Sequence, residues 1–142
     1  MIGIDPINIH FTIPASDPLG KNEVLGKLRF LSESVILSWR LKGSVFRGGK
    51  NEMQTIELSY LDIEHVELVK KWFKIRSIIL RIGDPSRVKE IPGVDMGKMV
   101  LQIDARSREE SKKLLSHIDY QKSIFILDDH ESRMKGMRSE PS

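Results

Sequence analysis

The chain has 142 residues, which is the size of one domain with short tails, and its lack of cysteine excludes disulfides, thiol nucleophiles and thiolate metal sites. The 23 Lys and Arg residues stand against 20 Asp and Glu residues, and the resulting charge of +3 permits an acidic partner without requiring one. No apolar run approaches the roughly 18 residues of a membrane span. Residues 1–6 lack the basic and apolar regions of a secretory signal, so we expect a cytoplasmic protein.

Residues 1–23 are expected to form an extended N-terminal segment. Isoleucine and phenylalanine alternate with other residues over Ile7–Ile13, which is the two-residue period of a strand with one buried face. The prolines and the glycine of residues 14–20 then predict a loop, because proline cannot donate a backbone hydrogen bond into a ladder. We therefore expect this segment to add one extra strand to the domain that follows.

A β-hairpin is predicted for residues 24–42. Side chains alternate between two faces over Val24–Leu31 and again over Val35–Lys42, and the Ser-Glu pair that follows the first strand predicts a tight reversal. Trp39 falls on the apolar phase of the second strand, so we expect it to pack in the core. The opposite phase carries the basic residues Lys27, Arg29, Arg40 and Lys42, which we expect to face outward.

The outward basic residues of this hairpin, together with those of the loop after it, are the candidate binding face. Gly43–Glu52 is rich in glycine and predicts an exposed, mobile loop, and it contributes Arg47 and Lys50. Loops and faces on a rigid scaffold are frequent recognition sites. The alternative interpretation is a solvated sheet face whose lysines oppose edge-to-edge aggregation.

Strand patterning continues after the glycine-rich loop. Alternation restarts at Ile56 and changes phase over Leu61–His65, which predicts a bend or bulge. We expect this strand to continue to Ile75 with Trp72 in the core, and one of the rings of Trp72 and Phe73 near the surface. The next strand is predicted to end at Ile82, before a Gly-Asp-Pro turn.

The last predicted elements are a strand and a helix. Arg87–Ile91 is expected to be a short edge strand, and Met99–Asp104 alternates as a half-buried strand. Ser107 with Glu110 three residues later matches a capping box, and Ser111, Leu114, Leu115 and Ile118 follow at helical spacing. Because everything upstream predicts strands, we expect this single helix to cover or plug the sheet.

Residues 121–142 are expected to be a C-terminal tail that is disordered from about Asp128. Four consecutive apolar residues lie near the start of the tail, and they could extend the helix, add a strand or contact a second copy of the chain. A solvated tail rarely carries such a run, so these residues are the candidate oligomer contact: Ile124, Phe125, Ile126 and Leu127.

A series of about seven antiparallel strands followed by one amphipathic helix resembles the bacterial PH-like domains, which belong to the pleckstrin-homology superfold and are related to GRAM domains. The resemblance covers residues 24–120. It is carried by Gly26–Phe30 with Leu37–Arg40, by Ile56–Ile63 with Val66 and Glu67, and by Leu101–Asp104 leading into the helix. It implies a mainly β fold, an antiparallel barrel or sandwich of about seven strands with one C-terminal helix. It also implies a scaffold that binds proteins or lipids and has no catalytic residues.

The sequence predicts a non-catalytic binding module. The histidines stand singly, without metal-ligand spacing, and no common phosphate-loop or nucleophile motif occurs, so we expect no catalytic residue, metal or cofactor. The expected partner is another protein. Weak electrostatic attachment to an anionic membrane and a barrel that binds a small apolar ligand are the alternatives, and a homo-oligomer is a further expectation. Nucleic acid is not an expected partner, because aromatic residues are only 6% of the chain.

Overall fold

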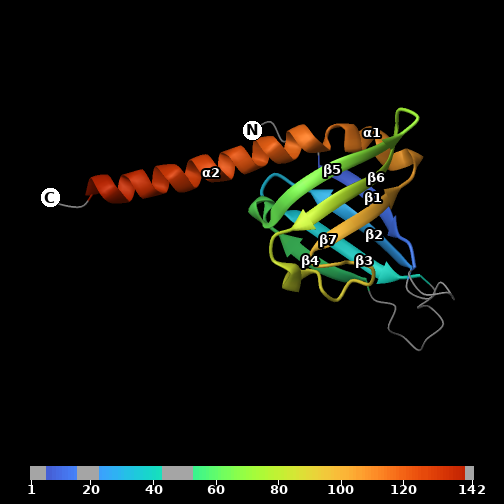
Figure 1. Cartoon of the computed structure of the whole chain (residues 1–142). Helices are drawn as coiled ribbons and strands as arrows, with labels where there is room; N and C mark the ends of the chain where they lie inside the picture. Colours follow the sequence, from blue (N-terminus) through green and yellow to red (C-terminus); the bar gives the residue numbers. More distant parts are fainter. Residues whose placement is uncertain (1–5, 16–22, 43–52, 140–142) are drawn as a thin grey trace.

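Seven antiparallel strands form one strongly curved sheet, and two helices follow it along the chain (Figure 1). The structure is a computed structural model that describes residues 6–15, 23–42 and 53–139, with side chains up to Leu127. The strands are β1 (Ile7–Ile13), β2 (Val24–Phe30), β3 (Val35–Leu41), β4 (Gln54–Leu58), β5 (Ile63–Lys71), β6 (Lys74–Ile82) and β7 (Lys98–Ile103), and the helices are α1 (Ala105–Lys112) and α2 (Leu114–Ser139). The sheet order is β4-β3-β2-β1-β7-β6-β5. The protein is therefore mainly β, and the sheet is not closed.

The N-terminal strand lies in the middle of the sheet. β1 pairs with β2 along its whole length, from Ile7 opposite Phe30 to Ile13 opposite Val24. Its other edge meets β7, where Phe11 lies opposite Ile103. The expected strand is confirmed, and it lies between β2 and β7. It joins the first four strands to the last three.

The inward faces of the strands share one continuous hydrophobic core. Every second residue of β1 is buried, as the two-residue period predicts, and Leu28, Leu37 and Leu80 are fully buried on other strands. Trp39 is partly buried and packs against this core, as expected. Gly26 gives room to the Phe11 ring, because a Cβ at residue 26 would lie 2.2 Å from the Phe11 Cζ.

The turn between β5 and β6 corrects the prediction that Trp72 packs in the core. Lys71 pairs with Lys74, so Trp72 and Phe73 form a two-residue turn instead of continuing the strand to Ile75. Both have positive φ angles, 53° and 68°, and both side chains lie in solvent, 80% and 97% exposed. One ring was expected near the surface, and both are there.

Two short 3-10 helices account for irregular stretches of the sequence. The first, η2 (Tyr60–Asp62), separates β4 from β5 and divides what the sequence predicted as one strand. The expected irregularity over Leu61–His65 is present, because the β5–β6 register also shifts between Ile63 and His65. The second, η3 (Pro85–Arg87), corrects the predicted edge strand at Arg87–Ile91, since Asp84 caps a helical turn there and turns follow it.

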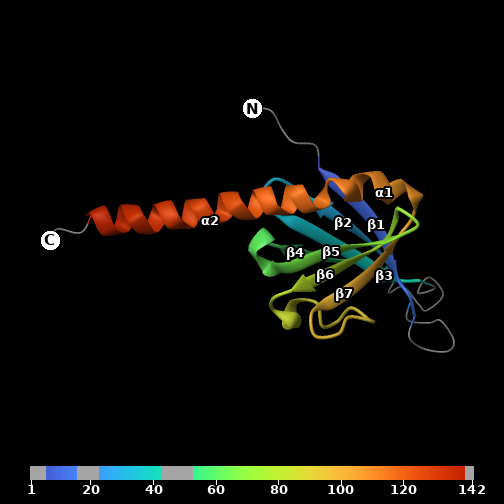
Figure 2. The ribbon, with the colours of Figure 1, turned by 45° about the horizontal axis from the view of Figure 1, so that its top comes forward.

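The C-terminal region is more helical than the sequence predicted. Asp104, and not Ser107, is the N-cap of α1, and its carboxylate accepts from the amides of Arg106 and Ser107. After Lys113 the chain continues as α2, which extends away from the sheet (Figure 2). The tail expected to be disordered from about Asp128 is helical to Ser139. No proline interrupts this stretch, and four of its charged residues are good helix formers: Glu131, Arg133, Lys135 and Arg138.

The first half of α2 packs on the open side of the sheet. Leu114, Ile118 and Gln121 are buried, and Phe125 is partly buried against the core. These residues recur every three or four positions, so they lie on one stripe of the helix. Leu115, which was expected on the same stripe, is 39% exposed.

Candidate functional site

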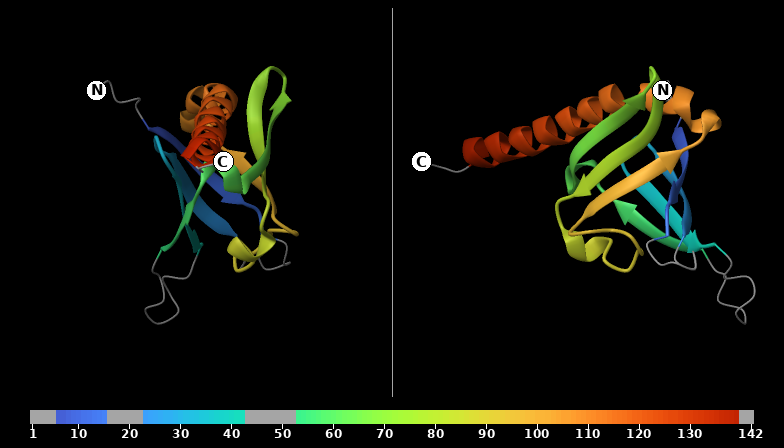
Figure 3. Two further views of the ribbon diagram at one scale, coloured as in Figure 1. Left: turned by 90° about the vertical axis from the view of Figure 1, so that its left-hand side faces the viewer. Right: turned by 45° about the vertical axis from the view of Figure 1, so that its right-hand side comes forward.

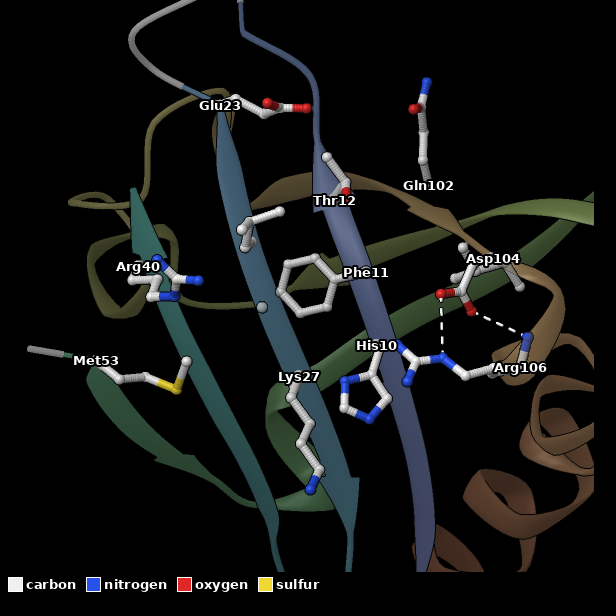
Figure 4. A pocket seen from close by; sticks show the side chains of 13 residues that line it. His10, Phe11, Thr12, Glu23, Lys27, Arg40, Met53, Gln102, Asp104 and Arg106 are labelled. Carbon is white, nitrogen blue, oxygen red and sulfur yellow. Dashed lines mark hydrogen bonds and ion pairs between the residues drawn. The ribbon is translucent and has the colours of Figure 1, made fainter. Parts of the chain in front are cut away.

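The outer face of β1, β2 and β3 carries two of the six predicted binding residues inside a surface depression. Lys27 lies opposite His10 on β1 and opposite Ser38 on β3, and Arg40 lies opposite Leu25. Because side chains alternate along a strand, His10, Lys27 and Arg40 face away from the core (Figure 4). Lys27 and Arg40 are half-buried at this face.

The depression has a cavity volume of about 660 Å³ and spans four strands and the start of α1. Its apolar portion includes Leu25 and Met53, and the Met53 side chain is 48% exposed. The lining residues come from β1, β2, β3, β7 and the chain next to them: His10, Phe11, Thr12, Glu23, Leu25, Gly26, Lys27, Arg40, Met53, Gln102, Ile103, Asp104 and Arg106.

Two of the other predicted basic residues are described by the structure, and neither shares this depression. Arg29 and Lys42 are exposed, and neither lines it. Arg47 and Lys50 fall in the glycine-rich loop and lie outside the described residues. Among the described residues of the candidate binding face, Lys27 and Arg40 are therefore the two that line a shaped surface.

The two carboxylates of the depression are each paired with a cation. Glu23 lies 3.1 Å from the Lys42 Nζ, and Asp104 lies 3.4 Å from the Arg106 Nε. Within the described part of the chain, Lys27 and Arg40 form no ion pair. Each pair contains one positive and one negative charge, so the two pairs add no net charge to the face and leave that of Lys27 and Arg40.

Ser107 fixes the edge of the depression where β7 stops pairing with β1. The His10 amide donates to the Ser107 Oγ at 2.8 Å, and this hydroxyl in turn donates to the His10 carbonyl at 3.3 Å. The buried serine thus supplies hydrogen-bond partners to the backbone of β1 where β7 has ended, at Ile103. The same corner places Arg106, next to the Asp104 cap, at the rim (Figure 4).

Several lining residues could not be found from the sequence. Gln102 reaches the face because Thr12 lies opposite it across the β1–β7 pair, and only two residue pairs join these strands. Their partners are about 90 positions apart in the chain, so local patterning carries no signal for them. Lys27 and Arg40 differ in this respect, since the alternation within one hairpin places both outward.

The predicted oligomer contact is divided between two sides of α2. Ile124 and Phe125 are partly buried, and the Phe125 ring lies 6.2 Å from the Tyr60 ring. Ile126 and Leu127 are 57% and 59% exposed. Of the three alternatives for this run, the structure shows that it extends the helix. Contact with a second copy stays a prediction for the exposed pair.

A polar cluster links α2 to the first hairpin. The Tyr60 hydroxyl donates to the Leu31 carbonyl and lies 2.8 Å from the His117 Nε2. Burial raises the pKa of Tyr60 and lowers the pKa of His117, because each loses solvation of its charged form. Both groups stay neutral near neutral pH, so the cluster is a structural link between α2, η2 and the β2–β3 turn.

No group of three His, Asp or Glu residues in the described ranges could hold a metal ion. Among the helices of the part that the structure describes, none is long and apolar enough to cross a membrane. No protein-family model matches the chain, and no curated protein matches it. The absence of catalysis, metal and cofactor stays a prediction.

Proposed function

We propose that this chain is a non-catalytic binding module on a PH-like scaffold, and that the outer face of β1–β3 binds an acidic segment of another protein. The observation that carries the proposal is the position of Lys27 and Arg40 in one depression, without a carboxylate partner among the described residues. Seven antiparallel strands followed by a helix support the scaffold assignment.

The composition of the depression favours a partner that is acidic and partly apolar. Leu25 and Met53 offer apolar surface between the charged groups, while Thr12 and Gln102 can donate and accept hydrogen bonds. An extended acidic peptide matches this mixture, since carboxylates would approach the cations and an apolar side chain would cover Met53. The cytoplasm stays the expected location.

The two alternatives have less support from the described residues. Membrane attachment through the glycine-rich loop depends on Arg47 and Lys50, which lie outside them. A barrel that binds an apolar ligand inside would need a hollow interior, whereas the buried side chains of all seven strands and of α2 pack in one cluster.

A binding assay with charge-reversal variants tests the proposal. The probe is a short fluorescein-labelled peptide of alternating Glu and Leu residues, followed by fluorescence anisotropy at about 0.1 M salt. We expect the double variant Lys27→Glu, Arg40→Glu to weaken binding by at least about tenfold, or about 1.4 kcal/mol.

The matched control is Arg29→Glu, which reverses a charge on the same face of β2 outside the depression. It should change the affinity less than about twofold, because Arg29 is exposed and solvent screens its charge. Equal losses in Arg29→Glu and in either single variant of the depression would refute a localised site.

A further inference from the structure

The turn between β5 and β6 presents two aromatic rings to solvent at the end of a projecting hairpin. Trp72 and Phe73 are the most exposed large hydrophobic residues of the described chain, at 80% and 97%. Figures 1 and 3 show this tip projecting from the sheet beside α1. Neither ring belongs to the hydrophobic core or packs against it. The folded chain thus gains no core packing from either ring.

The backbone of this turn is unfavourable for the residues that occupy it. Trp72 and Phe73 have φ angles of 53° and 68°, so both adopt the left-handed region. Two-residue hairpin turns with this geometry favour Asn and Gly, and bulky side chains there are strained. An Asn-Gly pair would form the same turn with less strain. Strain without a packing gain is typical of residues kept for binding.

The charged residues around the tip are basic, and their placement also does not stabilise the hairpin. From Leu68 to Gly83 the sequence holds five basic residues and no acidic one. Lys71 and Lys74 lie directly opposite each other in the ladder, an arrangement of like charges that destabilises a hairpin. The cations nearest the tip are all exposed, and among the described residues none forms an ion pair: Lys70, Lys71, Lys74 and Arg76.

An apolar apex with a collar of cations matches the layers of an anionic bilayer. Tryptophan is enriched at the membrane–water interface, and lysine and arginine beside it meet acidic headgroups. A hairpin that projects from the sheet can enter a lipid surface without any change in the fold. We propose that the Trp72–Phe73 tip inserts into the interface of a membrane that contains anionic lipid. This site is separate from the outer face of β1–β3.

Vesicle binding of the full chain tests this proposal. The probes are phosphatidylcholine vesicles with and without roughly 30 mol% phosphatidylserine, in cosedimentation at about 0.1 M and about 0.5 M salt. We expect binding only to the anionic vesicles, and weaker binding at the higher salt. In a Trp39→Phe background, the emission of Trp72 should shift to shorter wavelength when these vesicles are added.

The decisive variant is Trp72→Asn with Phe73→Gly, which supplies the residues that the turn prefers. It should lower vesicle affinity by at least about tenfold while the melting temperature stays equal or rises, so lost binding cannot be ascribed to unfolding. Met96→Asn is the matched control, because it replaces an exposed apolar residue that also has a positive φ, at the end of β6 opposite the tip, and it should bind vesicles like the unmodified protein.

Three results would overturn the proposal. They are equal binding to neutral and anionic vesicles, no binding to either, and vesicle binding by the Asn-Gly variant that equals that of the unmodified chain. If no vesicle is bound, a groove on another protein remains as the binding partner of the tip. None of these results bears on the peptide assay of Lys27 and Arg40, so the two proposals fail separately.

Discussion

Replacing Gly26 by alanine should destabilise the protein through a single identified clash. The added methyl group would lie 2.2 Å from the Phe11 Cζ and 2.7 Å from each Cε of the ring, far inside van der Waals contact. The ring cannot simply turn into solvent, because Phe11 is only 4% exposed between β2 and the core. Either the ring leaves its rotamer or β1 shifts from β2 at the centre of the sheet.

The expected cost of Gly26→Ala is that of overpacking a core, about 1–3 kcal/mol. For a chain of this size each kcal/mol lowers the melting temperature by about 2–4 °C. Urea unfolding followed by circular dichroism measures the free energy, provided that the slope with denaturant stays unchanged.

A second substitution shows whether the Phe11 ring is the cause. Phe11→Leu alone should destabilise the protein, because it removes a buried ring. In the Gly26→Ala background it should cost less, and the two changes should couple by at least about 0.5 kcal/mol. Additive effects, or a Gly26→Ala protein as stable as the parent, would show that the packing of Phe11 over Gly26 is wrong.

Three further predictions concern α2. Burial places the folded-state pKa of His117 below its ordinary value of 6.5, so its contribution to stability is complete above about pH 6.5 and is lost as the pH falls through the lowered pKa. The His117→Gln protein should therefore lose less stability between pH 7 and pH 5 than the parent does. Equal dependence of stability on pH in the two proteins would contradict this. Leu114→Asp should lower the free energy of unfolding by several kcal/mol, because it buries an unpaired charge. Leu115→Asp, at the neighbouring exposed position, should lower it by less than about 1 kcal/mol. Equal melting temperatures for these two variants would contradict the packing of α2. We expect self-association through Ile126 and Leu127, so Ile126→Glu with Leu127→Glu should convert an oligomer to monomer in light scattering without a lower melting temperature, and a parent chain that is monomeric at high micromolar concentration would exclude this contact.

Alternation within the sequence was sufficient to place the strands of the first hairpin and their outward cations. It failed where the chain leaves a strand without a turn signal. The turn at Trp72 and Phe73 contains no Gly, Asn, Asp or Pro, so local chemistry could not distinguish it from a continuing strand. The pairing of Lys71 with Lys74 fixes the turn, and that pairing is stabilised by the sheet and not by the turn residues.

Other features depend on contacts that are distant in sequence. Ser107 matched a helix cap by spacing, yet its hydroxyl bonds to His10, 97 residues away. Asp104 is the N-cap instead, because it is the last residue before α1 begins at Ala105. Gln102 and Arg106 reach the depression only after β7 has paired with β1. A sequence pattern could therefore suggest the basic half of the candidate site, but not its other wall.

The central claim is that the outer face of β1–β3 is a recognition surface for an acidic peptide. Its most direct test is a titration of the ¹⁵N-labelled protein with the Glu-Leu peptide, followed by amide chemical shifts. We predict saturable changes that concentrate at His10, Lys27, Arg40 and Gln102, with small changes at Arg29 and at the Trp72–Phe73 turn. Changes spread over all basic residues alike, or no saturation, would contradict the claim.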